Sequence, residues 1–403
     1  MPIGVTQRKH ARGYFDINHA GQLSIRSSHW KSERARLRFH LSPIRFFQKH
    51  INAMMVNYIA LPGMMVELFR IRTAELGEIQ FIKYWSVRHV RKKEIAAEIC
   101  TGFAAEIECV EATAMPIDQL VLKMRDVLTA LSILTRQAIT LHGWRWEKRN
   151  CFESAWFDPL QPNLAPDMAE EPIDDLCFPD EFQAQAQSLV GGFLAASAEL
   201  KQVVTLLSVA LAPHVEQSTA ANFSALFSAL EQAISLEKLT TEEKKKLRES
   251  DGVLIAELVG LKTRIEAANG HHAESVAARI AGLAESVKSS GPSFNVRFEK
   301  FSSAYPCVAP YMSDLWPLKG TQTVPGLKQI RDSLAHGLTE EYSSQALGVA
   351  HWHFARLSER LAFALIEAEM PKGIYFDSFF LNRNDWYKRS YWESIRATAT
   401  QKS

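Results

Sequence analysis

A proline-rich acidic segment divides this chain into two parts with different hydrophobic periodicities. Proline at the density seen over residues 158–180 stops both helices and β-ladders, and the acidic side chains keep the segment in water. We therefore expect a linker over 158–180 between two domains in this chain of 403 residues. The residues concerned are Pro159, Pro162, Pro166, Pro172 and Pro179, with Asp158, Asp167, Glu170, Glu171, Asp174, Asp175 and Asp180.

The part before the linker, residues 1–157, reads mainly as strands. Apolar and polar residues alternate over 81–90 and 95–110, with many β-branched and aromatic side chains. Residues 13–17 and 23–25 flank Asn18 and Gly21 in a hairpin-like arrangement. Between 117 and 137 the period changes, because apolar residues recur three and four apart. The sequence therefore predicts a β-rich N-terminal domain that contains one amphipathic helix.

The part after the linker, residues 181–370, has the periodicity of helices. Residues 193–211 are predicted to form one helix, which Pro213 ends. Thr240 and Glu243 match a capping box that opens a helix to about residue 268. A last long helix is predicted from residue 343 or 344 to about 369. The fold class is therefore α+β, a β-rich N-terminal domain followed by an all-α bundle.

Residues 371–403 form a C-terminal tail that is too aromatic for a free disordered segment. We expect it to pack on the bundle or across a dimer, with stacking on RNA as the alternative. Its aromatic and basic residues are Tyr375, Phe376, Phe379, Phe380, Trp386, Tyr387, Tyr391, Trp392, Lys388 and Arg389.

The formal charge of +1 conceals a basic front and an acidic back. Residues 1–100 hold 17 basic and 7 acidic residues, whereas the remainder holds 29 basic and 38 acidic ones. Such asymmetry indicates a nucleic-acid or anionic partner. If the front is a sheet, alternate residues share a face and can form a phosphate-binding stripe, near the aromatics Trp30, Tyr84 and Trp85. The candidate binding residues are Arg34, Arg36, Arg38, Arg88, Arg91, Lys92 and Lys93.

The same surface has two other interpretations. It can be the ordinary charged outer face of a soluble sheet, or it can recognise a partner other than nucleic acid.

No metal, cofactor or membrane anchor is expected. The cysteines form no CxxC pair, and no apolar stretch follows the first residues, so reduced thiols in a cytoplasmic protein are predicted. The most apolar stretch, 189–212, is interrupted by Glu199 and Lys201 and reads as a core helix. His351 and His353 lie ~200° apart on a helix, so we expect one to be packed and the other exposed, without a shared metal. The cysteines are Cys100, Cys109, Cys151, Cys177 and Cys307.

The strongest candidate for chemistry is the segment 327–337. Its buried stripe is Leu327, Ile330 and Leu334, which leaves three polar residues off the stripe, toward solvent or a partner: Arg331, Asp332 and His336. A histidine in the last turn lies near the negative end of the helix dipole, which favours its protonated form. An arginine can hold a non-bridging phosphate oxygen and a histidine can transfer protons, so the trio fits a phosphodiester site.

Spacing alone is weak evidence for such a site. Arg45 and His50 have the same separation, and solvated helix residues explain any such pair. Five residues also place Arg331 and His336 ~140° apart around an α-helix. The two side chains converge only through the length of the arginine or with a copy from a second chain.

The residue identities of the motif are stronger evidence for a functional site than its spacing. IRDSLAHG, residues 330–337, resembles the signature of HEPN domains, all-α bundles with an arginine, a polar residue, three further residues and a histidine. Residues 223–231 resemble the early helix of such domains, and 293–298 resemble the helix before the motif, with 314–316 leading into it. The resemblance covers roughly residues 190–370.

In overall plan the chain is similar to ApeA-type anti-phage proteins, which join an N-terminal β-rich domain to a C-terminal HEPN domain. At the N-terminus this similarity rests on GYFDINHAGQLSI and on the leucine-rich helix after Ile117.

The resemblance implies a metal-independent endoribonuclease whose two protomers pair with their motif helices facing across a composite cleft. It implies that His336 is the general acid/base for attack of the RNA 2′-hydroxyl, that Arg331 stabilises the phosphorane, and that Asp332 orients one of them. The product would be a 2′,3′-cyclic phosphate. The implied setting is abortive infection: host or phage RNA is cut after the N-terminal domain senses a phage-derived trigger.

Two other functions remain open. A non-catalytic regulatory protein would use the HEPN bundle to dimerise or to bind nucleotide or RNA. A helical scaffold would bind RNA through the basic front, with an affinity that depends strongly on salt.

Overall fold

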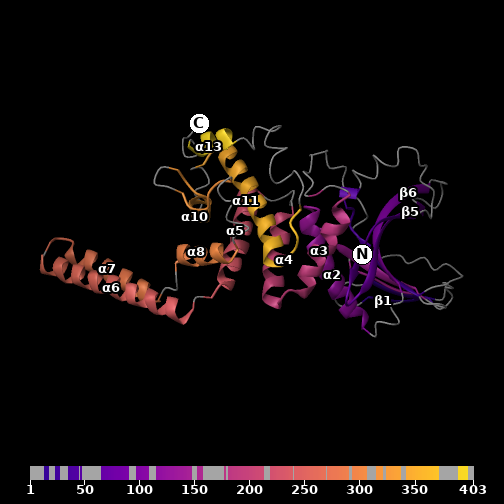
Figure 1. Cartoon of the computed structure of the whole chain (residues 1–403), viewed down its shortest axis with the longest axis horizontal. Helices are drawn as coiled ribbons and strands as arrows, with labels where there is room; N and C mark the ends of the chain where they lie inside the picture. Colours follow the sequence, from indigo (N-terminus) through magenta and orange to yellow (C-terminus); the bar gives the residue numbers. More distant parts are fainter. Residues whose placement is uncertain are drawn as a thin grey trace. The chain divides into compact units, whose positions relative to one another are not determined.

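The structure, a computed structural model, is α+β, with an antiparallel sheet built from the N-terminal part of the chain and helices after it (Figure 1). This confirms the α+β class. The described residues are 13–17, 23–27, 35–44, 46–47, 65–89, 97–108, 115–147, 152–157, 177, 180–212, 218–238, 240–268, 270–289, 293–305, 315–320, 324–336, 342–371 and 389–397.

Eight strands form one sheet in the order β1-β2-β8-β7-β3-β6-β5-β4, and every neighbouring pair is antiparallel. The predicted N-terminal hairpin is the β1–β2 pair, and the two alternating segments are β5 and β6. The strands are β1 (Gly13–Ile17), β2 (Leu23–Ser27), β3 (Arg36–Leu41), β4 (Met65–Thr73), β5 (Gly77–His89), β6 (Ala97–Glu108), β7 (Leu141–Glu147) and β8 (Phe152–Trp156).

The helices follow the sheet, except for α2, which lies between β6 and β7 in the chain, as predicted. They are α2 (Ile117–Leu134), α3 (Phe182–Ala195), α4 (Ala198–Leu211), α5 (Thr219–Leu236), α6 (Thr241–Ala267), α7 (Ala273–Ser289), α8 (Phe294–Ala304), α10 (Leu327–Ala335), α11 (Ser344–Leu365) and α13 (Arg389–Ala397).

Two helix boundaries differ from the sequence prediction. The predicted helix over 193–211 is broken, because the side chain of Ser197 accepts a hydrogen bond from the N–H of Leu200 and starts α4 as a new helix. The last long helix ends at Leu365 rather than near residue 369, and Glu367 adopts a left-handed φ of 53°. The capping box of Thr240 and Glu243 is confirmed, with both reciprocal hydrogen bonds.

The chain divides into two compact units. Residues 1–226 and 315–403 form the first unit, and residues 227–314 form the second. The sheet therefore shares a unit with α3, α4, α10, α11 and α13. Of the predicted linker, only residues 177 and 180 lie in the described part of the chain.

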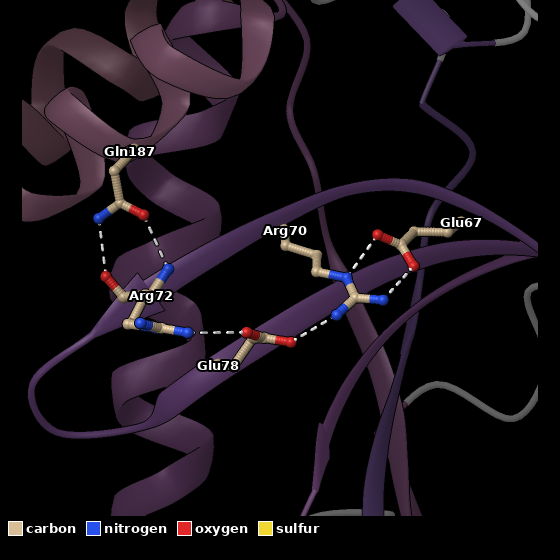
Figure 2. Close-up of polar contacts among 5 residues, drawn as sticks. All are labelled: Glu67, Arg70, Arg72, Glu78 and Gln187. Atoms are coloured by element: carbon tan, nitrogen blue, oxygen red, sulfur yellow. Dashed lines mark hydrogen bonds and ion pairs between the residues drawn. The ribbon is translucent and has the colours of Figure 1, made fainter.

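Helix α3 is attached to the sheet by aromatic packing and by a side-chain amide. Phe182, at the start of α3, stacks on Phe46 and meets the ring of Phe69 on β4 edge-on. Gln187 pairs with the backbone of Arg72, as Figure 2 shows: its Oε1 accepts from the N–H and its Nε2 donates to the C=O, both at 2.7 Å. Because β4 is the last strand of the sheet, this amide satisfies backbone groups that no further strand pairs.

The solvent side of the same hairpin is held by ion pairs. Arg70 donates from Nε and Nη2 to both carboxylate oxygens of Glu67, and from Nη1 to Glu78 at 2.8 Å (Figure 2). The hydrogen bond from Arg70 lowers the pKa of Glu67, with a further contribution from Gln80. These groups are exposed, so the network orders the hairpin surface more than it stabilises the fold.

A buried ion pair joins α2 to α11 within the first unit. Arg136 donates from Nε and Nη2 to the two carboxylate oxygens of Glu359 at 2.7 and 3.0 Å, and its side chain is 8% exposed against 1% for Glu359. Arg356 adds a contact of 2.9 Å to the same carboxylate.

The backbone of Arg136 is also unusual. It has a φ of 50°, and it ends α2 with two hydrogen bonds, from its own N–H to Ile133 and from the N–H of Gln137 to Ser132. This is the pattern of a Schellman motif, where glycine is the usual residue. The ion pair with Glu359 accounts for an arginine at this position.

Replacing Glu359 by alanine should lower the free energy of unfolding by about 3–5 kcal/mol, because Arg136 is left buried without its carboxylate. Chemical denaturation of the purified chain measures this. The matched control is Asp126→Ala, which removes a more exposed pair with Lys201 at 3.7 Å and should change the value by less than about 1 kcal/mol. Equal effects of the two substitutions would contradict the assigned role of the buried pair.

Candidate functional site

The motif helix α10 begins against an extended segment of the same unit. The N–H groups of Leu327 and Lys328 donate to the carbonyls of Pro317 and Leu318, each at 3.0 Å. The Gln329 side chain returns to the N–H of Gly326 at 2.7 Å. These bonds satisfy donors of the first turn that have no partner within the helix. A helix of nine residues thus has its start fixed by the segment that precedes it in the chain.

Two glycines allow this close approach of backbone to backbone. A Cβ on Gly326 would collide with the backbone of residues 318–320, and a Cβ on Gly320 would collide with Gly326 and with the Gln329 side chain. Any larger residue at either position would push α10 away from the segment that caps it.

A buried histidine of α11 fixes this segment. Nδ1 of His353 accepts the backbone N–H of Trp316 at 2.8 Å, and the indole N–H of Trp316 donates to the carbonyl of Pro325 at 3.0 Å. Burial, together with the positive charge of Arg360, lowers the pKa of His353 to about 3. The ring is therefore neutral at ordinary pH, with Nδ1 available as an acceptor.

The structure brings Arg331 and Asp332 together on a half-exposed face of α10, with Lys328 beside them. Asp332 accepts from Nζ of Lys328 at 2.5 Å and from Nη1 of Arg331 at 3.0 Å. Burial alone would raise the pKa of Asp332, but the hydrogen bonds and positive charges of Lys328 and Arg331 lower it overall. One carboxylate therefore holds two cations in this structure.

His336 lies apart from that cluster. It is the residue that ends α10, its backbone N–H donates to the carbonyls of Asp332 and Ser333, and its side chain is exposed. Within the part of the chain that the structure describes, no residue hydrogen-bonds its imidazole. Nearby, the hydroxyls of Ser333 and Tyr342 are 3.2 Å apart. A single copy thus presents the arginine–aspartate pair and the histidine as separate groups.

The basic front has a different environment from the motif. Arg36 and Arg38 lie on one face of β3, as alternation predicts, while Leu37 and Phe39 are buried on the other. Nε of Arg36 donates to Glu147 on β7 at 2.8 Å, and Arg38 pairs with Glu106 on β6. Both guanidinium groups therefore already have carboxylate partners across the sheet.

The remaining candidates of the basic front are not described in full. Arg88 is a residue of β5 whose side chain is not described. Arg34, Arg91, Lys92 and Lys93 lie outside the described residues.

The described residues also bear on the predicted histidine, metal, cysteine, membrane and tail features. His353 is buried and His351 half-buried, and no group of three or more His, Cys, Asp or Glu side chains there could hold a metal ion. Cys177 is buried and is not part of a disulfide. No helix in the described ranges has both the length and the apolar character needed to cross a membrane. In the tail, α13 packs against α11 and buries Ile395.

Comparisons with protein-family models, with curated proteins and with solved structures found no match to this chain.

Three residues that position the motif were not found by sequence reasoning. The i,i+4 spacing of Lys328 and Asp332 is a recognisable helix ion-pair signal. The contact between His353 and Trp316 had no sequence signal, because its hydrogen bond joins residues 37 apart in the chain.

The depressed pKa of His353 predicts a pH-dependent stability. Below pH 6.5 the unfolded chain binds a proton that the folded chain does not bind until about pH 3, so stability falls as the pH falls through this window. His353→Asn keeps an acceptor near Nδ1 but cannot titrate, and it should reduce the slope by up to about 1.4 kcal/mol per pH unit. Urea unfolding at several pH values measures this, and an unchanged slope would contradict the assigned burial.

Removal of the Lys328 ammonium should raise the pKa of Asp332, because the hydrogen bond and charge that lower it are lost. Titration of ¹³C-labelled aspartate carboxyls by NMR, in the parent and in Lys328→Gln, measures the change. Lys123→Gln, which removes an ammonium paired with Glu75, should leave the Asp332 titration where it was. An Asp332 curve that is the same in all three proteins would show that Lys328 does not act on this carboxyl.

Proposed function

We propose that this chain is a metal-independent endoribonuclease of the HEPN type that acts in cytoplasmic anti-phage defence. The observation that carries the proposal is the arrangement of α10. This short helix, anchored at its start, carries Arg331 and Asp332 in contact on a half-exposed face and an exposed His336 at its end. The match of IRDSLAHG to the HEPN signature supports the same reading.

The chemistry follows from the residue types. His336 accepts the proton of the RNA 2′-hydroxyl as that oxygen attacks the adjacent phosphorus, or donates a proton to the leaving 5′-oxygen. Arg331 hydrogen-bonds the non-bridging oxygens and stabilises the charge of the phosphorane. Asp332, which contacts Arg331, orients that guanidinium. Cleavage would leave a 2′,3′-cyclic phosphate and a 5′-hydroxyl.

The proposed active form is a homodimer. Arg331 and His336 are ~140° apart around α10, so two facing helices supply the pair more readily than one. Lys328 adds a positive charge beside Arg331, which helps a largely acidic half of the chain to attract RNA. In this proposal the N-terminal domain receives the phage-derived trigger.

One observation favours the non-catalytic alternative, in which the bundle serves dimerisation or nucleotide binding. Asp332 accepts hydrogen bonds from both nearby cations, Lys328 and Arg331. An ion-pair cluster with a purely structural role would make the same contacts. A third function, RNA binding through the basic front, is less well supported, since Glu147 and Glu106 already pair with Arg36 and Arg38.

Incubation of the purified full-length chain with RNA in EDTA tests the proposal. The parent should cleave, and His336→Ala should be slower by ~10²–10⁴-fold, the range for loss of a general acid/base. Arg331→Ala should be slower by ~10²-fold or more. His271→Ala, which removes an exposed histidine of the second unit, is the matched control and should cleave like the parent.

The cellular counterpart is growth arrest when the chain is overproduced, relieved by His336→Ala and not by His271→Ala. RNA cleavage by His336→Ala at the rate of the parent would refute the nuclease assignment and favour the regulatory alternative.

A further inference from the structure

The second unit has an unusually apolar surface on its long helical hairpin. Helices α6 and α7 pack side by side along their length, yet α6 buries none of its 27 residues (Figure 1). Of nine large hydrophobic side chains exposed in the described part of the chain, six lie on these two helices. Apolar surface gathered in this way marks an interaction site. The six are Val253, Leu254, Val259, Leu261, Val276 and Leu283.

The seam between the two helices has coiled-coil spacing. Helix α7 buries Ala277, Ile280 and Ala284, which are three and four residues apart. On α6, Leu258 and Ile265 are half-buried and seven apart. The seam is thus already occupied, and the exposed apolar residues lie outside it.

Four of these residues form a second apolar row on one face of the hairpin. Leu254 and Leu261 are seven apart on α6, and Val276 and Leu283 are seven apart on α7; their exposure ranges from 38% to 57%. At ~100° per residue, Leu254 and Leu261 lie ~40° and ~60° from the seam residue Leu258, and Val276 and Leu283 lie ~40° and ~60° from the seam residue Ile280, in the same rotational sense. Because the helices are antiparallel, the same sense on both places the two rows on the same face.

Two opposite charges flank this row on α6. Glu257 and Arg264 are both exposed and share one side of the helix, but lie two turns or ~10.5 Å apart along it, too far to pair with each other. Among the described residues, none forms an ion pair with either. If two copies of this helix edge lie antiparallel, the acidic residue of each copy faces the basic residue of the other.

We propose that this face of the α6–α7 hairpin binds the same face of a second copy of the chain, forming an antiparallel four-helix bundle. A two-fold axis that crosses α6 between Glu257 and Arg264 places each acid opposite the base of the other copy. The four apolar residues of each hairpin then meet at the centre. Such a contact is isologous and closed, as most homodimer contacts are. It uses the second unit, and it does not depend on the proposed nuclease function.

Charge reversal tests the pairing. Glu257→Arg and Arg264→Glu should each weaken self-association at least ~10-fold, because each places like charges opposite one another. An equimolar mixture of the two variants should associate as the parent does, since every pair is again opposite in sign. Light scattering after size exclusion measures the mass against 45.4 kDa for one chain. A monomeric parent at micromolar concentration, or a mixture no tighter than either variant alone, would overturn the proposal.

A second comparison separates this contact from any dimer made by the motif helices. Leu261→Asp should raise the dissociation constant of the parent assembly at least ~10-fold, whether or not α10 also makes a contact between copies. Val259→Asp is the matched control: it is an exposed apolar residue of the same helix on the opposite side of the seam, and it should leave the mass unchanged. Circular dichroism confirms that both variants fold. Equal dissociation constants for Leu261→Asp and the parent would refute the docking face.

Discussion

The position of the candidate site depends on the buried ion pair between Arg136 and Glu359. Arg136 closes α2 in a left-handed conformation, and its two hydrogen bonds to Glu359 fix α11 against the part of the unit that contains the sheet. Removing two charges from water is costly, so such a pair is maintained only by good geometry and further hydrogen bonds. The pair therefore fixes the position of α11, which makes the contacts to the motif segment.

A series of hydrogen bonds connects this ion pair to the start of α10. Helix α11 also carries His353, six residues before Glu359, and His353 holds the backbone of Trp316. Trp316 in turn holds the residue before Gly326, at the start of α10. The sheet part and the motif helix are thus connected within one unit by buried polar contacts.

The sequence predicted the features that depend on residues close together in the chain, and it missed those that depend on residues far apart. Local sequence patterns located β1, β2, β5, β6 and α2, and the Thr240–Glu243 box located the start of α6, because these signals lie within a few residues. The strands β4, β7 and β8 were not predicted. The Ser197 cap was missed because strong helical periodicity continues on both sides of it. Alternation placed Arg36 and Arg38 on one face of β3, but it does not identify their partners Glu106 and Glu147, which come from neighbouring strands.

The candidate site divides in the same way. The motif residues were identified from the sequence itself, and helix geometry placed them off the buried stripe of α10. The pair Arg136–Glu359 spans 223 residues, and the Gly320–Gly326 approach depends on tertiary contact, so neither had a local signal. The sequence thus proposed the motif residues, while the framework that holds them required the structure.

The most direct measurement is the chemistry of the RNA ends left by the purified chain in EDTA. Attack by the 2′-hydroxyl predicts a 2′,3′-cyclic phosphate on one fragment and a 5′-hydroxyl on the other, with no cleavage where the 2′-hydroxyl is replaced by hydrogen. Fragments with 3′-hydroxyl and 5′-phosphate ends, or equal cleavage of a 2′-deoxy substrate, would contradict the roles given to Arg331 and His336.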